Sequence, residues 1–288
     1  MRMPTGMRFW TAAALARAAM ATGIVGLAMT GGAQAQEFLI APTRAVFDGG
    51  ATTQEITVMN RGSETRTYRV QLENRRLEPD GRYIVATDVT PGDKFASGFV
   101  RLSTHQLTLG PLESGTIRLV LRKPGGTPKG EYRSHLIVRE SPTLDDAEPG
   151  LDVGGGLSIR MTPVLGISIP VIVHQGDLSA RVEVTNATRA ADARTPDLEN
   201  VTVTLEANGD RSEFVDLRLL GQSGRHSQSY FEMRGVSVYW PNNRRTVTLS
   251  LTAQQTARLR EGTTRLQWQT VDPNGQPIGP ASERPIGG

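Results

Sequence analysis

The sequence predicts an all-β protein made of two β-sandwich domains, and three observations predict it. Short runs in which apolar and polar residues alternate recur from Phe38 onward, separated by Gly, Pro, Asn and Asp. No long helical period interrupts them, and only Ala253–Glu261 has the pattern of a helix, of one or two turns. The 253 residues from Gln36 to the end suit two domains of ordinary size. Many short, regularly spaced strands are typical of sandwiches or barrels.

Residues 1–35 predict a secretory signal peptide. Arg2 and Arg8 form a positive n-region, a stretch of small apolar residues follows, and Ala33-Gln34-Ala35 has the pattern of a cleavage site. The alternative is a membrane anchor, which needs about 18 strongly apolar residues, but Arg17 interrupts the run. No later apolar span follows, so the sequence predicts export without stable membrane insertion.

The charge of the chain is balanced once this signal is set aside. The whole sequence holds 32 Lys+Arg and 29 Asp+Glu, and residues 1–35 contain three of the arginines and no acid. The remaining residues therefore carry 29 charges of each sign. Nucleic-acid binding is not expected, because it needs an excess of positive charge to neutralise phosphates. The lack of cysteine excludes disulfides and thiolate metal sites.

The expected strands divide into a first domain, 36–173, and a second domain, 174–288. Leu157–Val173 is too long for one strand, so we interpret it as the last strand of the first domain running into a linker near His174–Asp177. Ala187–Pro196 is expected to be an exposed loop. The expected strands of the first domain are Phe38–Val46, Thr53–Asn60, Arg66–Asn74, Phe99–Ser103, Thr116–Arg122, Glu131–Arg139 and Leu157–Val173. Those of the second domain are Ala180–Thr185, Val201–Glu206, Phe214–Leu219, Val236–Trp240, Thr246–Thr252 and Arg265–Val271.

The sequence shows no motif of a catalytic or metal site, so neither an enzyme nor a cofactor is expected. Its four histidines have none of the spacings of short metal-binding motifs. Asp145, Asp146 and Glu148 do not have the spacing of a calcium-binding EF-hand loop. Gly221-Gln222-Ser223-Gly224 lacks the pattern of a nucleophile elbow. These observations favour a binding or structural protein over an enzyme.

Three segments of the first half carry a resemblance to a known family. Thr43–Gly50 contains an arginine, Arg44, just after the predicted mature N-terminus, and Glu131–Pro142 ends in Arg-Glu-Ser-Pro. Large apolar residues alternate with polar ones at three positions: Leu157, Ile159 and Met161. In order and spacing these segments resemble the first, sixth and seventh strands of the PapD-like periplasmic pilus-assembly chaperones of the chaperone–usher pathway. The resemblance covers most of residues 37–173. It implies two immunoglobulin-like β-sandwich domains at an angle around a cleft.

The resemblance also implies a mechanism and partners. In the periplasm, the seventh strand would pair with a pilin-like subunit that lacks its own last strand, and the chaperone would deliver this client to an outer-membrane usher. Three side chains would fill the groove of the client: Leu157, Ile159 and Met161. Arg44 would hold the C-terminal carboxylate of the client, and Glu131 would take part in an ion bridge between the domains. The pattern alone leaves open that the three apolar side chains face their own core, since a shift of one residue inverts the face.

Two departures from the family stand out. An ungapped alignment places Gly166 where the family has the lysine that accompanies the cleft arginine, so Arg44 would act alone. Ile169-Pro170-Val171 stands where the family has the arginine that would accompany Glu131. A structural or adhesive immunoglobulin-like exported protein therefore remains the alternative, and an exported hydrolase or sugar-binding protein is a third possibility.

Overall fold

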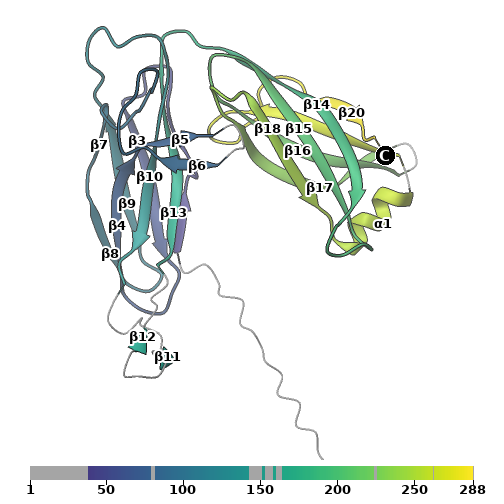
Figure 1. The fold of residues 1–288 in the computed structure, drawn as a ribbon, viewed down its shortest axis with the longest axis horizontal. Coiled ribbons are helices and arrows are strands. Elements are labelled where there is room, and N and C mark those ends of the chain that lie inside the picture. The colour runs from purple at the N-terminus through teal and green to yellow at the C-terminus, as the bar shows by residue number, and fades with distance from the viewer. Residues whose placement is uncertain are drawn as a thin grey trace, which may run out of the picture. The chain divides into compact units, whose positions relative to one another are not determined.

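The computed structural model describes residues 38–78, 82–142, 151–152, 158–159, 164–223, 226–261 and 263–287, and the predicted signal peptide lies outside them. The described chain is almost entirely β-strand, with one short helix, and it forms two β-sandwiches (Figure 1). The predicted fold class is confirmed.

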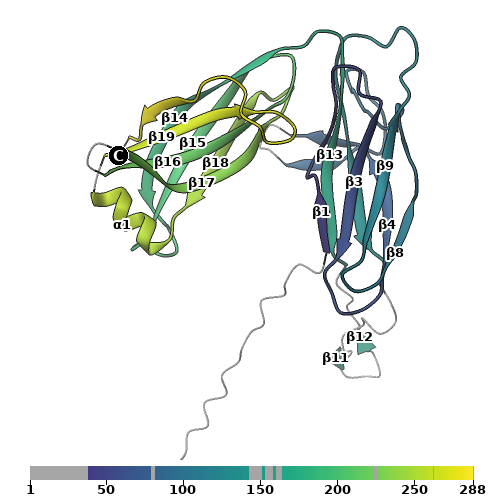
Figure 2. The same cartoon turned by 180° about the vertical axis from the view of Figure 1, so that it is seen from behind.

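The first sandwich packs a four-stranded sheet against a five-stranded one (Figure 2). The four-stranded sheet has the order β1 (Phe38–Ala41), β3 (Thr53–Asn60), β9 (Ser114–Leu121) and β7 (Val100–Leu102). The five-stranded sheet has the order β2 (Ala45–Phe47), β13 (Gly166–Gln175), β10 (Gly130–Glu140), β4 (Arg66–Glu73) and β8 (Gln106–Leu109). Alternate residues of these strands point inward and form one core, for example Ile56, Leu119 and Leu136, each fully buried. Period-two alternation places one face of each strand in this core.

The strand β10 is buried on both faces from Gly130 to Val138. Its even-numbered residues from Tyr132 to Val138 face the core, with the exception of the polar Ser134, and the opposite face carries Glu131, Arg133 and His135. A two-stranded hairpin packs against this second face, since Tyr83 meets the ring of His135 at a centroid distance of 4.8 Å. The hairpin consists of β5 (Arg75–Leu77) and β6 (Tyr83–Val85).

The second sandwich packs a three-stranded sheet against a four-stranded one. The three-stranded sheet has the order β14 (Ala180–Ala191), β15 (Glu199–Gly209) and β18 (Arg244–Ser250). The four-stranded sheet has the order β17 (His226–Val238), β16 (Glu213–Ser223), β19 (Thr264–Val271) and β20 (Ser282–Pro285).

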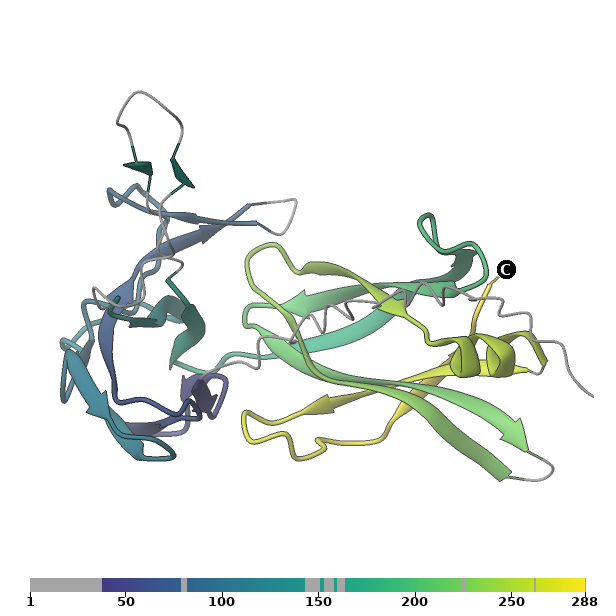
Figure 3. The same cartoon turned by 90° about the horizontal axis from the view of Figure 1, so that it is seen from below.

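The helix α1 (Ala253–Glu261) begins and ends where the sequence predicts it. Thr252 and Gln255 form a capping box, in which each side chain bonds the backbone N–H of the other, at 3.3 and 2.9 Å. Thr256 and Leu259 are its buried residues. Figure 3 shows α1 beside the C-terminal end of the chain.

Several strand predictions need correction. The expected strand Leu157–Val173 begins only at Gly166, and Ser158–Ile159 instead forms β12, which pairs with β11 (Leu151–Asp152). The loop expected over Ala187–Pro196 is largely strand, because β14 continues to Ala191 past a bulge between Val184 and Asn186. The first part of β17 was missed as well, since Ser227, Gln228 and Ser229 are polar and exposed.

Gly209 packs against the start of β14 in a way that only glycine permits. It has a φ of +152°, and a Cβ at this position would collide with the backbone of Ser179 and Ala180, where β14 starts. We expect Gly209→Ala to lower the free energy of unfolding by roughly 2 kcal/mol or more, through backbone strain and the clash. Gly98→Ala is the control, because Gly98 has open space and no positive φ. Equal thermal melting of the two variants would contradict this account.

Candidate functional site

The two sandwiches touch through a small apolar cluster, which we call the interface cluster: Val46, Ile172, Phe214 and Val271, with Tyr239 packed on it. Val46 and Ile172 are neighbours in the pairing of β2 with β13 and lie on the face opposite the first core. The run Pro170–Val173 is continuously apolar because both faces of the strand are buried here. Val171 and Val173 lie in the core of the first sandwich, and Ile172 packs against the second sandwich.

Beside this cluster lies the buried carboxylate of Glu131, which is 2% exposed. Ser212 of the second sandwich donates its backbone N–H to Oε2 at 2.6 Å and its hydroxyl to Oε1. His174 Nε2 lies 3.2 Å from Oε2, and Arg133 Nη1 lies 3.6 Å from Oε1. A buried charge is tolerated only when it is paired and hydrogen-bonded. Glu131 therefore joins the two sandwiches, and its cationic partners are His174 and Arg133, which the sequence analysis did not identify as such.

The charge of His174 depends on two carboxylates of its own sandwich. Burial alone lowers the pKa of His174, but the hydrogen bonds and charges of Glu131 and Asp48 outweigh burial and raise the pKa above its ordinary value. Asp48 Oδ2 lies 3.4 Å from Nδ1 of the imidazole. Arg211 extends the network across the interface, at 3.5 Å from Asp48, and its Nε bonds Glu213 at 2.7 Å.

Arg44 lies at this interface rather than free in a cleft. Its Nε donates to the carbonyl oxygen of Pro273 at 2.9 Å, and its guanidinium lies 4.0 Å over the ring of Phe214. Burial lowers the pKa of Arg44, partly offset by Tyr239 and the nearby acids. The resemblance implied that the partner of Arg44 is the C-terminal carboxylate of a client, outside this chain. In the structure it already contacts the second sandwich, and only its two Nη groups donate no hydrogen bond within the described residues.

An aromatic series continues from Phe214 across the interface. Phe214 meets Tyr239 edge-on at 6.3 Å, and Tyr239 meets Tyr83 of the β5–β6 hairpin at 6.1 Å. Arg133 lies 4.6 Å over the ring of Tyr239. Burial, followed by the charges of Arg133 and Arg75, lowers the pKa of His135 to about 3, so this imidazole stays neutral. Two arginines on aromatic rings thus flank the interface cluster, as cation–π contacts allow.

One edge of β13 is open. The first strand of the sandwich divides at Pro42 and Arg44, so that β1 pairs with β3 and only the short β2 pairs with β13, at Val171–Val173. In the described part of the chain, no strand pairs with the preceding residues Gly166–Pro170 on this side. We call this segment the free edge.

The hydrogen-bond pattern shows which groups the free edge presents. Glu140 N–H donates to Leu165 C=O at 3.0 Å, and bonded and non-bonded pairs alternate along an antiparallel ladder. The backbone groups of Gly166, Ser168 and Pro170 therefore point away from β10. Pro170 has no N–H to offer, which an edge position tolerates.

Of the three predicted groove-filling residues, the structure describes only the backbone of Ile159. Leu157 and Met161 lie outside the described residues, and Ile159 pairs with Leu151 in the β11–β12 ladder, where its side chain is not described. Two other apolar side chains directly before β13 are exposed, Val164 at 49% and Leu165 at 45%.

The ungapped placement of Gly166 beside Arg44 is wrong. Gly166 pairs with Arg139, whereas Ala45, next to Arg44, pairs with Val171. The register therefore places Pro170 beside Arg44. Ile169-Pro170-Val171 likewise lies inside β13, and the residue that accompanies Glu131 comes later, at His174.

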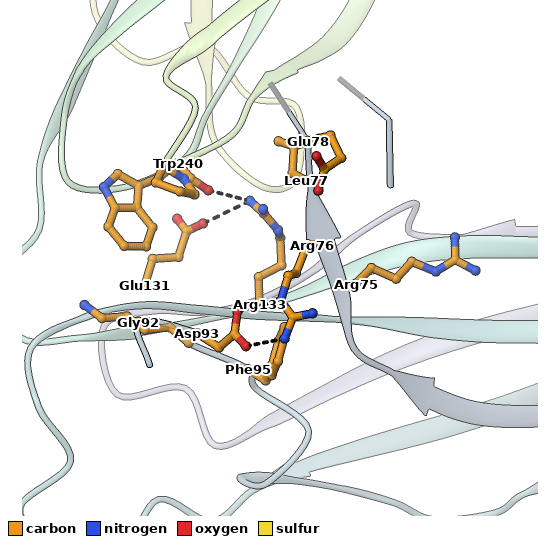
Figure 4. Close-up of a pocket in the computed structure, with 12 residues that line it drawn as sticks. Arg75, Arg76, Leu77, Glu78, Gly92, Asp93, Phe95, Glu131, Arg133 and Trp240 are labelled. Atoms are coloured by element: carbon orange, nitrogen blue, oxygen red, sulfur yellow. Dashed lines mark hydrogen bonds and ion pairs between the residues drawn. The ribbon is translucent and has the colours of Figure 1, made fainter. Parts of the chain in front are cut away.

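A cavity of about 250 Å³ opens beside Glu131, Arg133 and Trp240 (Figure 4). It is lined by Arg75, Arg76, Leu77, Glu78, Gly92, Asp93, Lys94, Phe95, Glu131, Arg133, Trp240 and Pro241. The described residues contain no cluster of side chains suited to a metal ion. No helix in the described part of the chain is long and apolar enough to cross a membrane.

The buried carboxylate generates the next prediction. We expect Glu131→Ala to lower the free energy of unfolding by about 3–5 kcal/mol, because it leaves His174, Arg133 and the donors of Ser212 without their acceptor. The control is Glu55→Ala, which removes an exposed ion pair with Arg118 worth at most about 1 kcal/mol. Denaturant unfolding followed by tryptophan fluorescence measures both, since Trp240 donates its N–H to Ser212 at the interface. Equal losses would show that Glu131 does not hold the interface.

The raised pKa of His174 predicts a pH dependence with a definite sign. A group whose pKa is higher in the folded state stabilises the fold fully below its unfolded pKa, about 6.5, and loses that contribution as the pH rises through the folded pKa. We expect the wild type to lose stability as the pH rises above about 6.5 more steeply than His174→Gln does. Denaturant unfolding at several pH values tests this, and parallel curves for the two proteins would refute it.

Comparisons with solved structures find chaperones that are similar to this chain at low sequence identity. No protein-family model and no curated protein sequence matches the chain. The YadV chaperone aligns at 10% identity with a TM-score of 0.43, over 86% of this chain and 100% of the other. The CupB2 chaperone of Pseudomonas aeruginosa aligns at 12% identity with a TM-score of 0.40, over 86% and 100%. A chaperone–tip adhesion subunit complex from the Csu pili of Acinetobacter baumannii aligns at 14% identity with a TM-score of 0.39, over 87% and 98%. At these values the similarity carries no residue-by-residue correspondence.

Proposed function

We propose that this chain is an exported, periplasmic assembly chaperone that binds a β-rich client by strand addition at the free edge of β13. The clients are pilin-like subunits, which the chaperone caps and hands to an outer-membrane usher. It acts by binding, without catalysis. The observation that carries the proposal is the free edge, which no strand of the described residues pairs with, in a sheet that β2 closes on the same side from Val171 onward.

An open edge is a hazard that proteins usually avoid, because its unpaired N–H and C=O groups invite other chains. The free edge presents the N–H and carbonyl groups of Gly166 and Ser168, whereas the parallel register of β2 takes the carbonyl group of Pro170. Exposed apolar side chains stand directly before it, at Val164 and Leu165. Backbone bonds with pockets for alternate side chains are the way in which strand addition recognises a partner.

In this proposal the residues before β13 supply most of the affinity. Burying a large aliphatic side chain contributes about 1.5–3 kcal/mol, so three give roughly 5–9 kcal/mol before the cost of ordering. Three side chains are proposed to enter the groove of the client: Leu157, Ile159 and Met161. Ile159 would have to leave its two-residue ladder with Leu151, which offers little resistance.

The proposed role of Arg44 is to hold the terminal carboxylate of the client. Its Nε stays on Pro273, and its two Nη groups form the fork that would bind a carboxylate. Because Arg44 also contacts Phe214, its removal is expected to weaken the contact between the sandwiches as well as the capture of the client.

Ser168→Pro tests strand addition directly. It removes an N–H that points to the free edge and leaves the ladder with β10 intact, so we expect a folded protein that captures at least about tenfold less client from periplasmic extract. Ile159→Asp should also fold and lose the client, because a charge cannot enter an apolar groove.

The matched control is Ile167→Pro. Ile167 bonds Val138 across the ladder and packs on the core, so this variant should lose about 3 kcal/mol or more of stability. Mass spectrometry must identify the captured protein as a small β-rich subunit. If Ser168→Pro folds and captures the same amount of client as the wild type, the free edge is not the binding element.

A further inference from the structure

A groove of about 390 Å³ lies on the outer face of the five-stranded sheet, where β4 and β10 run beside β13. Its base is apolar, because Ile137 lines it and is only 2% exposed. Val164 and Pro142 line it as well, and both are exposed. Its polar lining consists of Arg69, Gln71, Arg139, Glu140 and Ser141. The groove therefore combines an apolar base with charged and polar walls.

Two arginines of this groove face each other across neighbouring strands. Arg69 of β4 and Arg139 of β10 are directly opposite in the antiparallel register. Side chains in that position stand about 5 Å apart at Cβ, and like charges there destabilise a sheet. Within the described residues Arg69 forms no ion pair. Arg139 lies 3.6 Å from Glu73, whose carboxylate already accepts from Arg75 at 2.6 Å.

The acid that lines the groove does not neutralise these arginines. The carboxylate of Glu140 is paired with Arg66, at 3.2 Å. The groove therefore keeps a surplus of positive charge, and an anionic group from outside the chain would relieve the repulsion between Arg69 and Arg139.

Only small residues of β13 separate this groove from the free edge. In the register of β13 with β10, Gly166 stands beside Arg139 and Ser168 stands beside Ile137. A Cβ at Gly166 would lie 2.9 Å from Cγ of Arg139, so the stem of this arginine lies over the glycine. Neighbouring strands are about 4.8 Å apart, so a strand added at the free edge would lie about 9.6 Å from β10. Long side chains from the two strands can meet over Gly166.

We propose that this groove receives a glutamate side chain of the strand that pairs with the free edge, and that Arg69 and Arg139 bind its carboxylate. The planar guanidinium group matches a carboxylate in geometry. The methylene groups of the glutamate would contact Ile137, whereas aspartate is too short to cross β13. The inference rests on the proposed function, because it needs an added strand. It adds a chemical requirement, namely that an accepted strand carries glutamate at the position beside Gly166.

The test measures by fluorescence anisotropy how labelled, end-capped peptides of alternating valine and threonine bind to the protein. One threonine is replaced by glutamate, glutamine or aspartate, at each position in turn, so that every register is sampled. We expect the best glutamate peptide to bind about fivefold more tightly than the matching glutamine or aspartate peptide. In Arg69→Gln and Arg139→Gln this preference should fall below about twofold. Both variants should melt like the wild type, because both side chains are exposed.

Arg118→Gln is the matched control for the loss of charge. Arg118 is an exposed arginine on the four-stranded sheet of the same sandwich, where it pairs with Glu55. This variant changes the net charge equally and should keep the preference for glutamate. Ser168→Pro should weaken the glutamate and glutamine peptides alike, since it blocks the backbone pairing that both need.

The outcomes distinguish a failure of this inference from a failure of the proposed function. Equal binding of the glutamate and glutamine peptides to the wild type overturns the inference and leaves strand addition standing, and so does a preference that survives in both arginine variants. If Ser168→Pro binds all peptides like the wild type, the groove binds acids without an added strand, and the inference is wrong. If no peptide binds, the inference is also wrong, whereas capture of the client by Ser168→Pro still decides on the proposed function.

A competing occupant of the groove is an acidic segment of this chain itself, with Asp145, Asp146 and Glu148. A preference that appears only after these three residues are changed to their amides would assign the groove to that segment and overturn the inference.

Discussion

Glu131 is only 2% exposed, so its carboxylate is buried. The elements around it each supply a hydrogen-bond donor or a cation. Removing such a charge from water costs several kcal/mol, which only good geometry repays. Ser212 of the second sandwich supplies two donors, its backbone N–H and its hydroxyl. Both reach the carboxylate oxygens of Glu131 in the observed placement of that sandwich. His174 lies near the end of β13, so its contact with Glu131 also fixes the point at which the linker begins. The carboxylate of Glu131 therefore orients the contact between the sandwiches, and the hydrogen bonds from Arg44 to Pro273 and from Arg133 to Trp240 add to it.

The apolar and polar parts of this interface contribute differently. Val46, Ile172, Phe214 and Val271 bury enough surface to supply several kcal/mol of attraction, at about 25 cal/mol per Å², but hydrophobic burial is non-directional. The hydrogen bonds of Glu131 are worth less in net terms, yet a misplaced Ser212 would leave a buried charge unsatisfied. Arg44 and Arg133, stacked on Phe214 and Tyr239, close the two sides of the cluster.

The sequence predicts the fold class, most of the core strands and α1, because these depend on local signals. The bounds of α1 follow from the capping pair Thr252 and Gln255 and from the short apolar period. It does not predict the β5–β6 hairpin, whose three-residue strands are too short and exposed to show alternation. His174 was missed because an ungapped alignment moved the interface position to Ile169–Val171.

The free edge is too weak to hold a partner by backbone bonding alone. Each hydrogen bond contributes about 0.5–1.5 kcal/mol net, whereas association costs an estimated 4–15 kcal/mol. With two N–H groups and two carbonyl groups, and with Pro170 unable to donate, the edge gains about 2–6 kcal/mol, which reaches only the low end of that cost. A chain without a matching apolar groove would gain too little free energy to remain bound. This protects the open edge from pairing with arbitrary chains. In the proposed function, a client that also accepts large apolar side chains gains enough binding free energy, so the missing N–H of Pro170 both weakens the edge and favours selectivity.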